Sequence, residues 1–239
     1  MNKEKEHIDN ILKTHASFDT RYLGGELSND DFMAIQKSFF DRESQWYASK
    51  KSRPDFTASR LQTIVQSAKK YLSKHQCETH NILDVGTGTG VLIKYINESF
   101  MNVRVHALDV SANQLAIAKS RYPDIETYQS DVTLFINPIG YDVIYCNACF
   151  GNLLNQQAAL RVMSAMLNDN GIVVLSHPLG SAFVQELHRS NSLIVPNTLP
   201  TNVQQVNDLI SGTPLTVVEL VDHKGLYLCV LKQTGYSFT

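Results

Sequence analysis

In this sequence of 239 residues, the clearest indication of a binding site is an aspartate followed by alternating glycines and threonines. The segment Asp84-Val85-Gly86-Thr87-Gly88-Thr89-Gly90 ends a short apolar run and precedes a stretch with helical spacing. Glycine adopts positive φ without strain, and a helix N-terminus offers N–H groups to a carboxylate or a phosphate. The segment therefore predicts a ligand-binding turn between a strand and a helix. Asp84, at the strand end, suits a ligand that carries an ammonium group.

The spacing of the glycines separates two classes of ligand. Dinucleotide-binding turns favour G-x-G-x-x-G, whereas the glycines here fall at 86, 88 and 90 and Val91 takes the third slot. A β-branched residue at that slot opposes the close helix–strand packing that a pyrophosphate site uses. The pattern disfavours NAD, and a nicotinamide-dependent oxidoreductase is kept as the alternative.

Two further aspartates end predicted strands in the same way. Asp109 lies at the end of the run 103–110, and Asp131 lies at the end of the run 125–132. A carboxylate can accept hydrogen bonds from two vicinal hydroxyls, such as those of a ribose. Because ligands bind at the carboxyl ends of the strands in open α/β sheets, we expect Asp84, Asp109 and Asp131 to form one cradle.

Strand-like and helical segments alternate through the middle of the chain, which predicts a Rossmann-like, doubly wound α/β sheet that is mostly parallel. The expected strands cover 82–85, 103–110, 125–132, 141–148 and 171–176, and expected helices include 57–72, 91–100 and 155–167, the last ended by Asn170-Gly171. Two later runs, 215–222 and 226–231, are joined by three residues. So short a joint excludes a parallel crossover, so these runs predict an antiparallel C-terminal hairpin.

The ends of this pattern suggest a division of the chain. Residues 1–56 are expected to form an N-terminal helical cap, broken in two at Gly24-Gly25. Residues 57–239 are expected to form the α/β domain. Within it, residues 178–214 contain four prolines and are expected to form a helix and a lid-like insertion on the ligand side.

The segment 82–90 resembles the first motif of class I S-adenosylmethionine-dependent methyltransferases. The acids at 109 and 131 and the segment 141–145 follow in that family's order, and the match covers about 57–235 in outline. The resemblance implies that Asp109 binds the ribose hydroxyls, Asp131 the adenine amino group and Asn147 the methionine part. The residues that it implies for cofactor binding are Asp84, Gly86, Thr87, Gly88, Gly90, Asp109, Val110, Asp131, Val132 and Asn147. A narrower resemblance, at 175–180 and 221–227, is to plant and algal methyltransferase-like proteins.

Two side chains are candidates for the transfer step. His177 follows the fifth strand, where this family often points side chains at the substrate, and histidine is a credible general base near neutral pH. The alternative is a loop histidine bonded to the backbone. Tyr47, beside Trp46, precedes the sheet, where related small-molecule enzymes fold an aromatic ring over the sulfonium, which cation–π attraction favours. The alternative is packing within a lid or core.

The expected reaction is in-line transfer of a methyl group from S-adenosylmethionine to a small molecule, with a base needed for a hydroxyl or a carbon acid. A cofactor-binding protein without catalysis and a nucleic-acid methyltransferase are the remaining rivals. The net charge of -2 gives no broad field for nucleic acid, and no apolar run is long enough to span a membrane. Four sparse cysteines and an N-terminus without an apolar signal core predict a cytoplasmic protein.

Three other patterns are weaker signals. Cys146 and Cys149 form a CxxC pair, which we interpret as small residues lining a pocket rather than as a redox pair or half a metal site; no metal is predicted. The segment 147–150 echoes the Asn-Pro-Pro-aromatic motif of amino-group methyltransferases but lacks both prolines. The basic run at 50–53 is expected to be a solvated face.

Overall fold

Seven strands form a single sheet in a computed structural model, which describes residues 3–17, 27–49, 55–72 and 79–234. The strand order is β3-β2-β1-β4-β5-β7-β6. The strands are β1 (His80–Val85), β2 (Val103–Asp109), β3 (Glu126–Gln129), β4 (Tyr141–Asn147), β5 (Leu167–His177), β6 (Leu215–His223) and β7 (Leu226–Gln233). The predictions made for Gly24-Gly25 and for residues 50–53 fall outside the described residues.

The pairing of the strands confirms the predicted fold class. Strands β1 to β5 pair in parallel, whereas β7 is antiparallel to both β5 and β6. The chain reverses its direction of travel across the sheet between β1 and β4, because β1 pairs with β2 on one side and with β4 on the other. The loops that follow β1 and β4 therefore diverge and leave a crevice at the carboxyl ends of these strands.

Helices cover both faces of the sheet and its carboxyl edge. They are α1 (Lys3–Ala16), α2 (Asn29–Ala48), α3 (Ala58–Lys69), α4 (Ile93–Ser99), α5 (Ala112–Arg121), α6 (Gln156–Ala165), α7 (Ser181–Ser190) and α8 (Val203–Ile210). Apolar residues of α3, α4 and α5 share one buried cluster, and those of α6, α7 and α8 belong to another. Within the described residues, no helix combines the length and the apolar character that crossing a bilayer requires.

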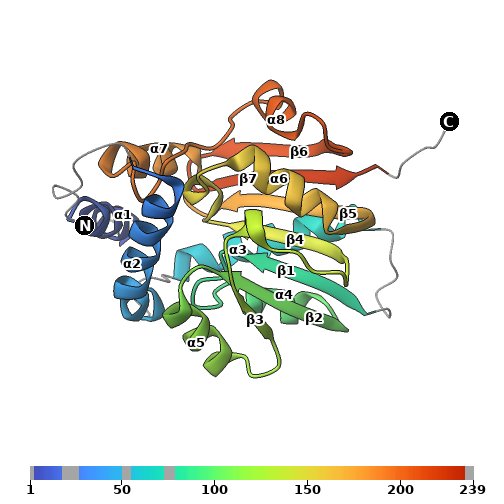
Figure 1. The fold of residues 1–239 in the computed structure, drawn as a ribbon, viewed down its shortest axis with the longest axis horizontal. Coiled ribbons are helices and arrows are strands. Elements are labelled where there is room, and N and C mark those ends of the chain that lie inside the picture. Colours follow the sequence, from blue (N-terminus) through green and yellow to red (C-terminus); the bar gives the residue numbers. More distant parts are fainter. Residues whose placement is uncertain (1–2, 18–26, 50–54, 73–78, 235–239) are drawn as a thin grey trace.

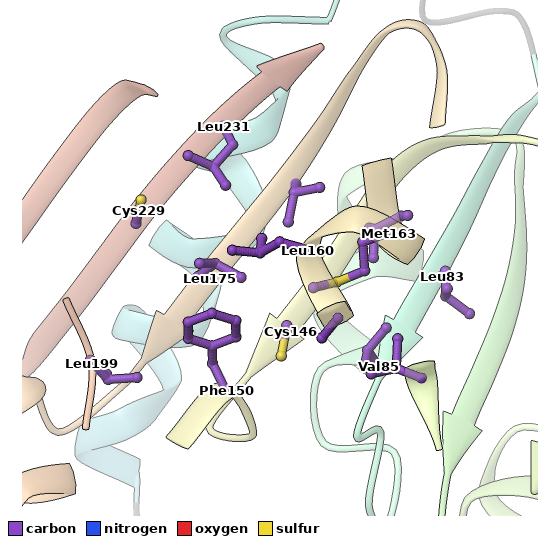
Figure 2. Close-up of a cluster of buried hydrophobic side chains, with 14 of the residues drawn as sticks. Leu83, Val85, Cys146, Phe150, Leu160, Met163, Leu175, Leu199, Cys229 and Leu231 are labelled. Carbon is purple, nitrogen blue, oxygen red and sulfur yellow. The ribbon is translucent and has the colours of Figure 1, made fainter. Parts of the chain in front are cut away.

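Close packing under α6 fixes the tips of the central strands. Leu160 and Met163 of α6 lie over Cys146 of β4 and Leu175 of β5, and all four are fully buried (Figure 2). Fully burying a side chain of leucine or methionine size contributes about 1.5–3 kcal/mol. The strand ends that carry the candidate site are therefore held by a dense apolar layer.

The start of β5 differs from the prediction. We expected a helix over 155–167 stopped by Asn170-Gly171, but α6 ends at Ala165 and β5 already begins at Leu167. Tyr141 pairs with Leu167 and Val143 pairs with Ile172, so β5 carries extra residues at an irregularity in the ladder. Asn170 has a φ of 62°. Its left-handed conformation therefore serves a bulge within the strand and not the end of a helix.

The two N-terminal helices lie at the edge of the sheet where the parallel strands end, on the left in Figure 1. Ser28 and Asp31 form a capping box that begins α2. Phe39 of α2 is fully buried in the core, and Gln36 Nε2 donates to the carbonyl oxygens of Asn152 and Ile194 at 2.7 and 3.0 Å. These contacts anchor α2 over the crevice.

The proline-containing segment 178–214 forms two helices where we expected one. Helix α7 contacts α1, whereas α8 contacts β6 and α6. Pro178 and Leu179 line the cavity described below, as do Phe183 and Leu187 of α7. The first half of the segment therefore lies beside the ligand side of the sheet, and α8 packs against the sheet edge.

Candidate functional site

A cavity of about 250 Å³ lies at the carboxyl ends of the central strands, with walls supplied by α1, α2 and α7. Its wall brings together eleven of the predicted site residues: Tyr47, Asp84, Gly86, Thr87, Gly88, Asp109, Val110, Asp131, Val132, Asn147 and His177. Gly90 is the exception, since it faces Tyr122 and Ile93. The three aspartates thus share one cavity, as a nucleoside cradle requires.

Asp84 is a buried acid, only 2% exposed. One of its oxygens accepts a hydrogen bond from Thr87 Oγ1 at 2.7 Å. Burial raises the pKa of Asp84 to about 7, the hydrogen bond from Thr87 opposes this rise, and the nearby Asp109 adds to it. A positively charged group in the cavity would relieve this penalty, because an opposite charge favours the ionised carboxylate.

Asp109 links the tip of β2 to the glycine turn. Its Oδ2 accepts from the Gly88 N–H at 2.8 Å, and its Oδ1 accepts from the Ser111 N–H at 2.9 Å. Burial raises the pKa of Asp109 to about 6 although these backbone hydrogen bonds lower it. Each carboxylate oxygen retains a second lone pair, so Asp109 can still accept from two hydroxyls.

Asp131 uses one oxygen to cap a short turn. Its Oδ1 accepts from the backbone N–H of Thr133 at 2.7 Å and from the hydroxyl of the same residue. Among the described residues, no donor is bonded to Oδ2 of Asp131. This half-buried carboxylate therefore offers an acceptor to an amino group in the cavity.

Neighbouring protein atoms require glycine at two positions of the glycine turn. Gly86 has a φ of 65°, and a Cβ on it would lie 2.3 Å from Cys149 Sγ. Gly88 has a φ of 55°, and a Cβ there would lie 2.7 Å from Gln114 Oε1. The glycines therefore allow both positive φ and the close approach of neighbouring side chains.

The two cysteines of the CxxC pair have different surroundings. Cys149 lines the cavity, whereas Cys146 is buried in the core.

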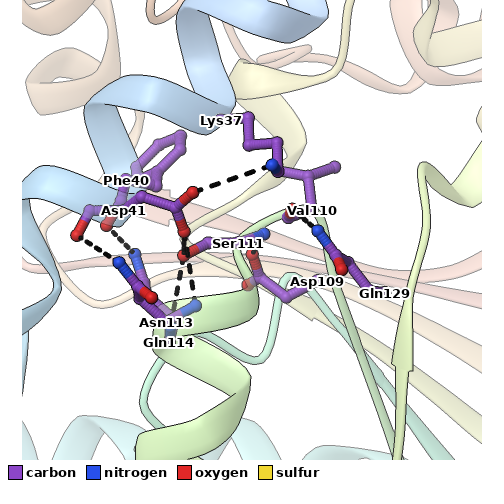
Figure 3. A network of polar contacts seen from close by, with 9 residues as sticks. All are labelled: Lys37, Phe40, Asp41, Asp109, Val110, Ser111, Asn113, Gln114 and Gln129. Atoms are coloured by element: carbon purple, nitrogen blue, oxygen red, sulfur yellow. Dashed lines mark hydrogen bonds and ion pairs between the residues drawn. The ribbon is translucent and has the colours of Figure 1, made fainter.

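Polar contacts join α2 to α5 beside Asp109, at the tip of β2 (Figure 3). Asp41 Oδ1 of α2 accepts from Ser111 Oγ at 2.6 Å and from the backbone N–H of Asn113 at 3.3 Å. Gln114 Nε2 donates to the Phe40 carbonyl at 3.3 Å. Since Ser111 also donates its N–H to Asp109, one residue connects the cap helix to the predicted ribose-binding acid. Asp41 was not predicted from the sequence, because no local pattern marks a contact 70 residues away.

Replacing Asp41 with alanine is expected to weaken binding of S-adenosylhomocysteine about tenfold. The change removes a charged acceptor, and a hydrogen bond to a charged group is worth about 1.5–3 kcal/mol. Isothermal titration calorimetry measures the affinity. Asp208→Ala is the matched control, because Asp208 accepts a hydrogen bond on the exposed surface of α8. Equal affinities for the two variants would contradict the role of Asp41.

Arg121 makes a second link between the cap and the glycine turn. Its guanidinium donates to the carbonyl oxygens of Thr89, at 2.8 Å, and of Ala48, at 2.5 Å. Ala48 ends α2 and directly follows Tyr47. Arg121 thus positions the end of α2 beside the turn, and like Asp41 it has no signal in the sequence.

Tyr47 of α2 and Asn147 of β4 both line the cavity. Tyr47 lies in a row of aromatic side chains, with ring centroids 6.2 Å from Phe40 and 4.9 Å from Trp46. Trp46 is outside the cavity wall. Asn147 Oδ1 accepts from Ser176 Oγ at 3.0 Å, which fixes the amide at the tip of β4. Their assigned roles remain predictions.

His177 is held in a defined orientation at the tip of β5. The Leu179 N–H donates to its Nδ1 at 3.1 Å, so Nδ1 carries a lone pair and Nε2 carries the proton of the neutral ring. Burial lowers the pKa of His177 to about 3. At neutral pH the ring therefore presents an N–H group, and not the lone pair that the predicted general base would need.

A sequence model of the family described as "Methyltransferase domain" matches residues 57–215 of this chain. The malonyl-[acyl-carrier protein] O-methyltransferase of Bacillus cytotoxicus is 34% identical over 111 residues, which cover 46% of this chain and 39% of that protein. Malonyl-[acyl-carrier protein] O-methyltransferase 1 of Ilyobacter polytropus is 27% identical over 160 residues, or 66% of this chain and 56% of that protein. The chain thus spans about half the length of the curated relatives that it matches.

Solved structures share the fold. The N-methyltransferase NodS from Bradyrhizobium japonicum WM9, solved with S-adenosyl-L-homocysteine, superposes with a TM-score of 0.61 at 15% identity. The superposition covers 81% of this chain and 98% of NodS. At this level of identity the likeness establishes the arrangement of helices and strands.

Proposed function

Because this chain belongs to the methyltransferase-domain family, we propose that it is an S-adenosylmethionine-dependent methyltransferase that acts on a small molecule. The observation that carries the proposal is the convergence of Asp84, Asp109 and Asp131 on one cavity beside the glycine turn. Family membership agrees with the resemblance deduced from residues 82–90.

The cavity fits S-adenosylmethionine in its chemistry. Asp84 is a buried acid whose raised pKa would fall beside an ammonium group, and Asp109 retains lone pairs for the two ribose hydroxyls. Asp131 Oδ2 is an acceptor for the adenine amino group. In this proposal Val110 and Val132 lie along the nucleoside, and Asn147 and Thr87 lie near the methionine part.

The chain's contribution to methyl transfer is mainly positional. The sulfonium of the cofactor supplies an activated methyl group, so the rate depends on holding the acceptor in line with the carbon–sulfur bond and on excluding water. In the proposed arrangement, helices α1 and α2 form the cap over the transfer site. Residues 178–187 close its side, and Tyr47 packs toward the sulfonium.

The relatives support an acceptor other than nucleic acid. The two reported above are named for O-methylation of malonyl-[acyl-carrier protein]. The chain's net charge of -2 agrees, since a nucleic-acid methyltransferase needs a basic surface for the phosphate backbone. We therefore propose a small-molecule or carrier-linked methyl acceptor.

Calorimetry separates the proposal from its rivals. The protein is expected to bind S-adenosylhomocysteine and to give no heat with NADH. The reverse result would establish the nicotinamide alternative. A screen of small metabolites with methyl-labelled S-adenosylmethionine then tests catalysis. Tight binding of the cofactor without label transfer to any metabolite would favour the non-catalytic alternative.

A further inference from the structure

Two histidines of the cavity wall are locked in opposite tautomers. His15 of α1 lies 3.0 Å, through its Nδ1, from the carbonyl oxygen of Ile11. A carbonyl oxygen only accepts, so Nδ1 of the neutral ring carries the proton and Nε2 carries a lone pair. His177 has the reverse arrangement, because its Nδ1 accepts from the Leu179 N–H. His15 can therefore act as a base toward a molecule in the cavity, and His177 can donate an N–H hydrogen bond to it.

Both rings are neutral and firmly placed near pH 7. His15 is 3% exposed, its ring stands 4.9 Å from that of Phe39, and Asn191 Nδ2 donates to its carbonyl oxygen at 3.0 Å. Burial lowers the pKa of His15, against the smaller effects of the Ile11 hydrogen bond and of Glu43. Among the described residues, no protein group is bonded to Nε2 of His15, although the ring lines the cavity.

Two ion pairs lie on α2 and α7, the helices that pack against His15. Glu43 of α2 favours the protonated ring, and its carboxylate is bonded to Arg42 at 2.6 Å. On α7, Glu186 and Arg189 are bonded to each other. The proton affinity of Nε2 is therefore set mainly by burial.

We propose that His15 is the general base of the methyl transfer and that His177 donates a hydrogen bond to a second oxygen of the acceptor. The inference rests on the proposed function and adds the substrate class to it. The acceptor is a hydroxyl compound with a neighbouring oxygen, such as a catechol or a hydroxy-carbonyl compound. The general base is thus assigned to His15 of α1, and not to His177 at the tip of β5 as the sequence predicted.

The step balances without a further reactant. The acceptor hydroxyl gives its proton to Nε2 of His15, while a lone pair of its oxygen forms the bond to the methyl carbon. The electrons of the broken carbon–sulfur bond stay on sulfur, and S-adenosylhomocysteine leaves as a neutral thioether. The imidazolium then releases the proton to water.

The test compares label transfer from methyl-labelled S-adenosylmethionine to catechols and hydroxy-carbonyl compounds with transfer to aniline and benzoate. We expect label on a hydroxyl oxygen. For that acceptor, kcat of the unaltered protein should rise with pH through an apparent pKa below 6.5, because the base must be deprotonated. His15→Gln should lower kcat about 100-fold and remove this limb of the profile, with affinity for S-adenosylhomocysteine retained.

Two companion variants make the test specific. His188→Gln is the matched control, because His188 also lies 2.8 Å from a carbonyl oxygen through Nδ1 but is outside the cavity wall, and it should behave like the unaltered protein. His177→Ala should raise KM for the hydroxyl acceptor, and His177→Gln, which keeps an N–H donor, should restore part of it.

Several results would overturn the inference while the proposed function stands. They are label on nitrogen or on a carboxylate, no label on any hydroxyl compound from a protein that binds S-adenosylhomocysteine, and full activity of His15→Gln. A protein that does not bind S-adenosylhomocysteine would instead remove the proposed function, and this inference with it.

Discussion

Replacing Asp84 with asparagine is expected to weaken binding of S-adenosylhomocysteine more than about 100-fold and to stabilise the ligand-free protein above pH 7. The first effect arises because the neutral amide cannot pair with the ammonium group of the ligand, and breaking a buried charge pair costs about 3–5 kcal/mol. The second arises because asparagine removes a buried charge that has no cationic partner in the ligand-free cavity.

The sign of the pH dependence follows from the raised pKa. Burial raises the pKa of Asp84 in the folded protein to about 7 from the usual 3.8. A carboxyl group whose pKa is higher in the folded state binds its proton more tightly when folded. Its stabilising contribution is therefore complete below about pH 4 and is lost as the pH rises to about 7. The difference corresponds to about 4 kcal/mol at most.

Asp109 also makes the ligand-free protein less stable as the pH rises, over a lower range of pH. Burial raises its pKa to about 6, so the ligand-free protein should lose further stability between about pH 4 and pH 6. Thermal unfolding without ligand is then expected to show a falling Tm from pH 5 to pH 8, and Asp84→Asn should flatten the upper part of this fall. Binding of S-adenosylhomocysteine near pH 6.5 should release protons, measured by calorimetry in buffers of different ionisation enthalpy.

A matched aspartate provides the control. Asp142 is also a buried strand acid, but it lies at the start of β4, where its oxygens accept from Asn81 N–H and Asn168 Nδ2 at 2.9 Å. Asp142→Asn should lower stability and leave the affinity for S-adenosylhomocysteine unchanged. An Asp84→Asn protein that binds this ligand as tightly as the unaltered protein would refute the role assigned to Asp84.

The features of the site that could be predicted from the sequence are those whose position depends only on a residue and its immediate neighbours in the chain. Asp84 and Asp109 lie at the ends of apolar runs that became β1 and β2, and the period of those runs is a local property. The antiparallel hairpin followed in the same way from the short joint between β6 and β7. These features could be predicted because chain connectivity alone places them.

The parts that it missed depend on contacts between distant segments. The link from Asp41 to Ser111 and the bond from Arg121 to Ala48 join residues about 70 apart in the chain. The tautomer of His177 depends on the direction of one backbone N–H two residues later. The bulge at Asn170 depends on pairing with β4. Tertiary geometry decides each of these, and a single sequence does not contain it in readable form.

Gly86→Ala is expected to reduce the affinity for S-adenosylhomocysteine by more than tenfold and to lower stability by about 2–5 kcal/mol. Gly86 has a φ of 65°, where an alanine is strained by about 1–2 kcal/mol. Its Cβ would also overlap Cys149, with 2.3 Å to Sγ and 2.6 Å to Cβ. Relief requires movement of the cavity wall, because both residues line it. Urea unfolding and calorimetry measure the two effects.

Two further variants separate strain from overlap. Gly212 has a φ of 79° with open space around the site of a Cβ, so Gly212→Ala should show the strain alone and leave binding intact. Adding Cys149→Gly to Gly86→Ala removes the overlapping atoms and should restore part of both affinity and stability, which a double-mutant cycle expresses as a coupling. If the double variant is no better than Gly86→Ala, contact with Cys149 is not what limits this position. The positive φ of the turn would then be the whole reason for glycine there.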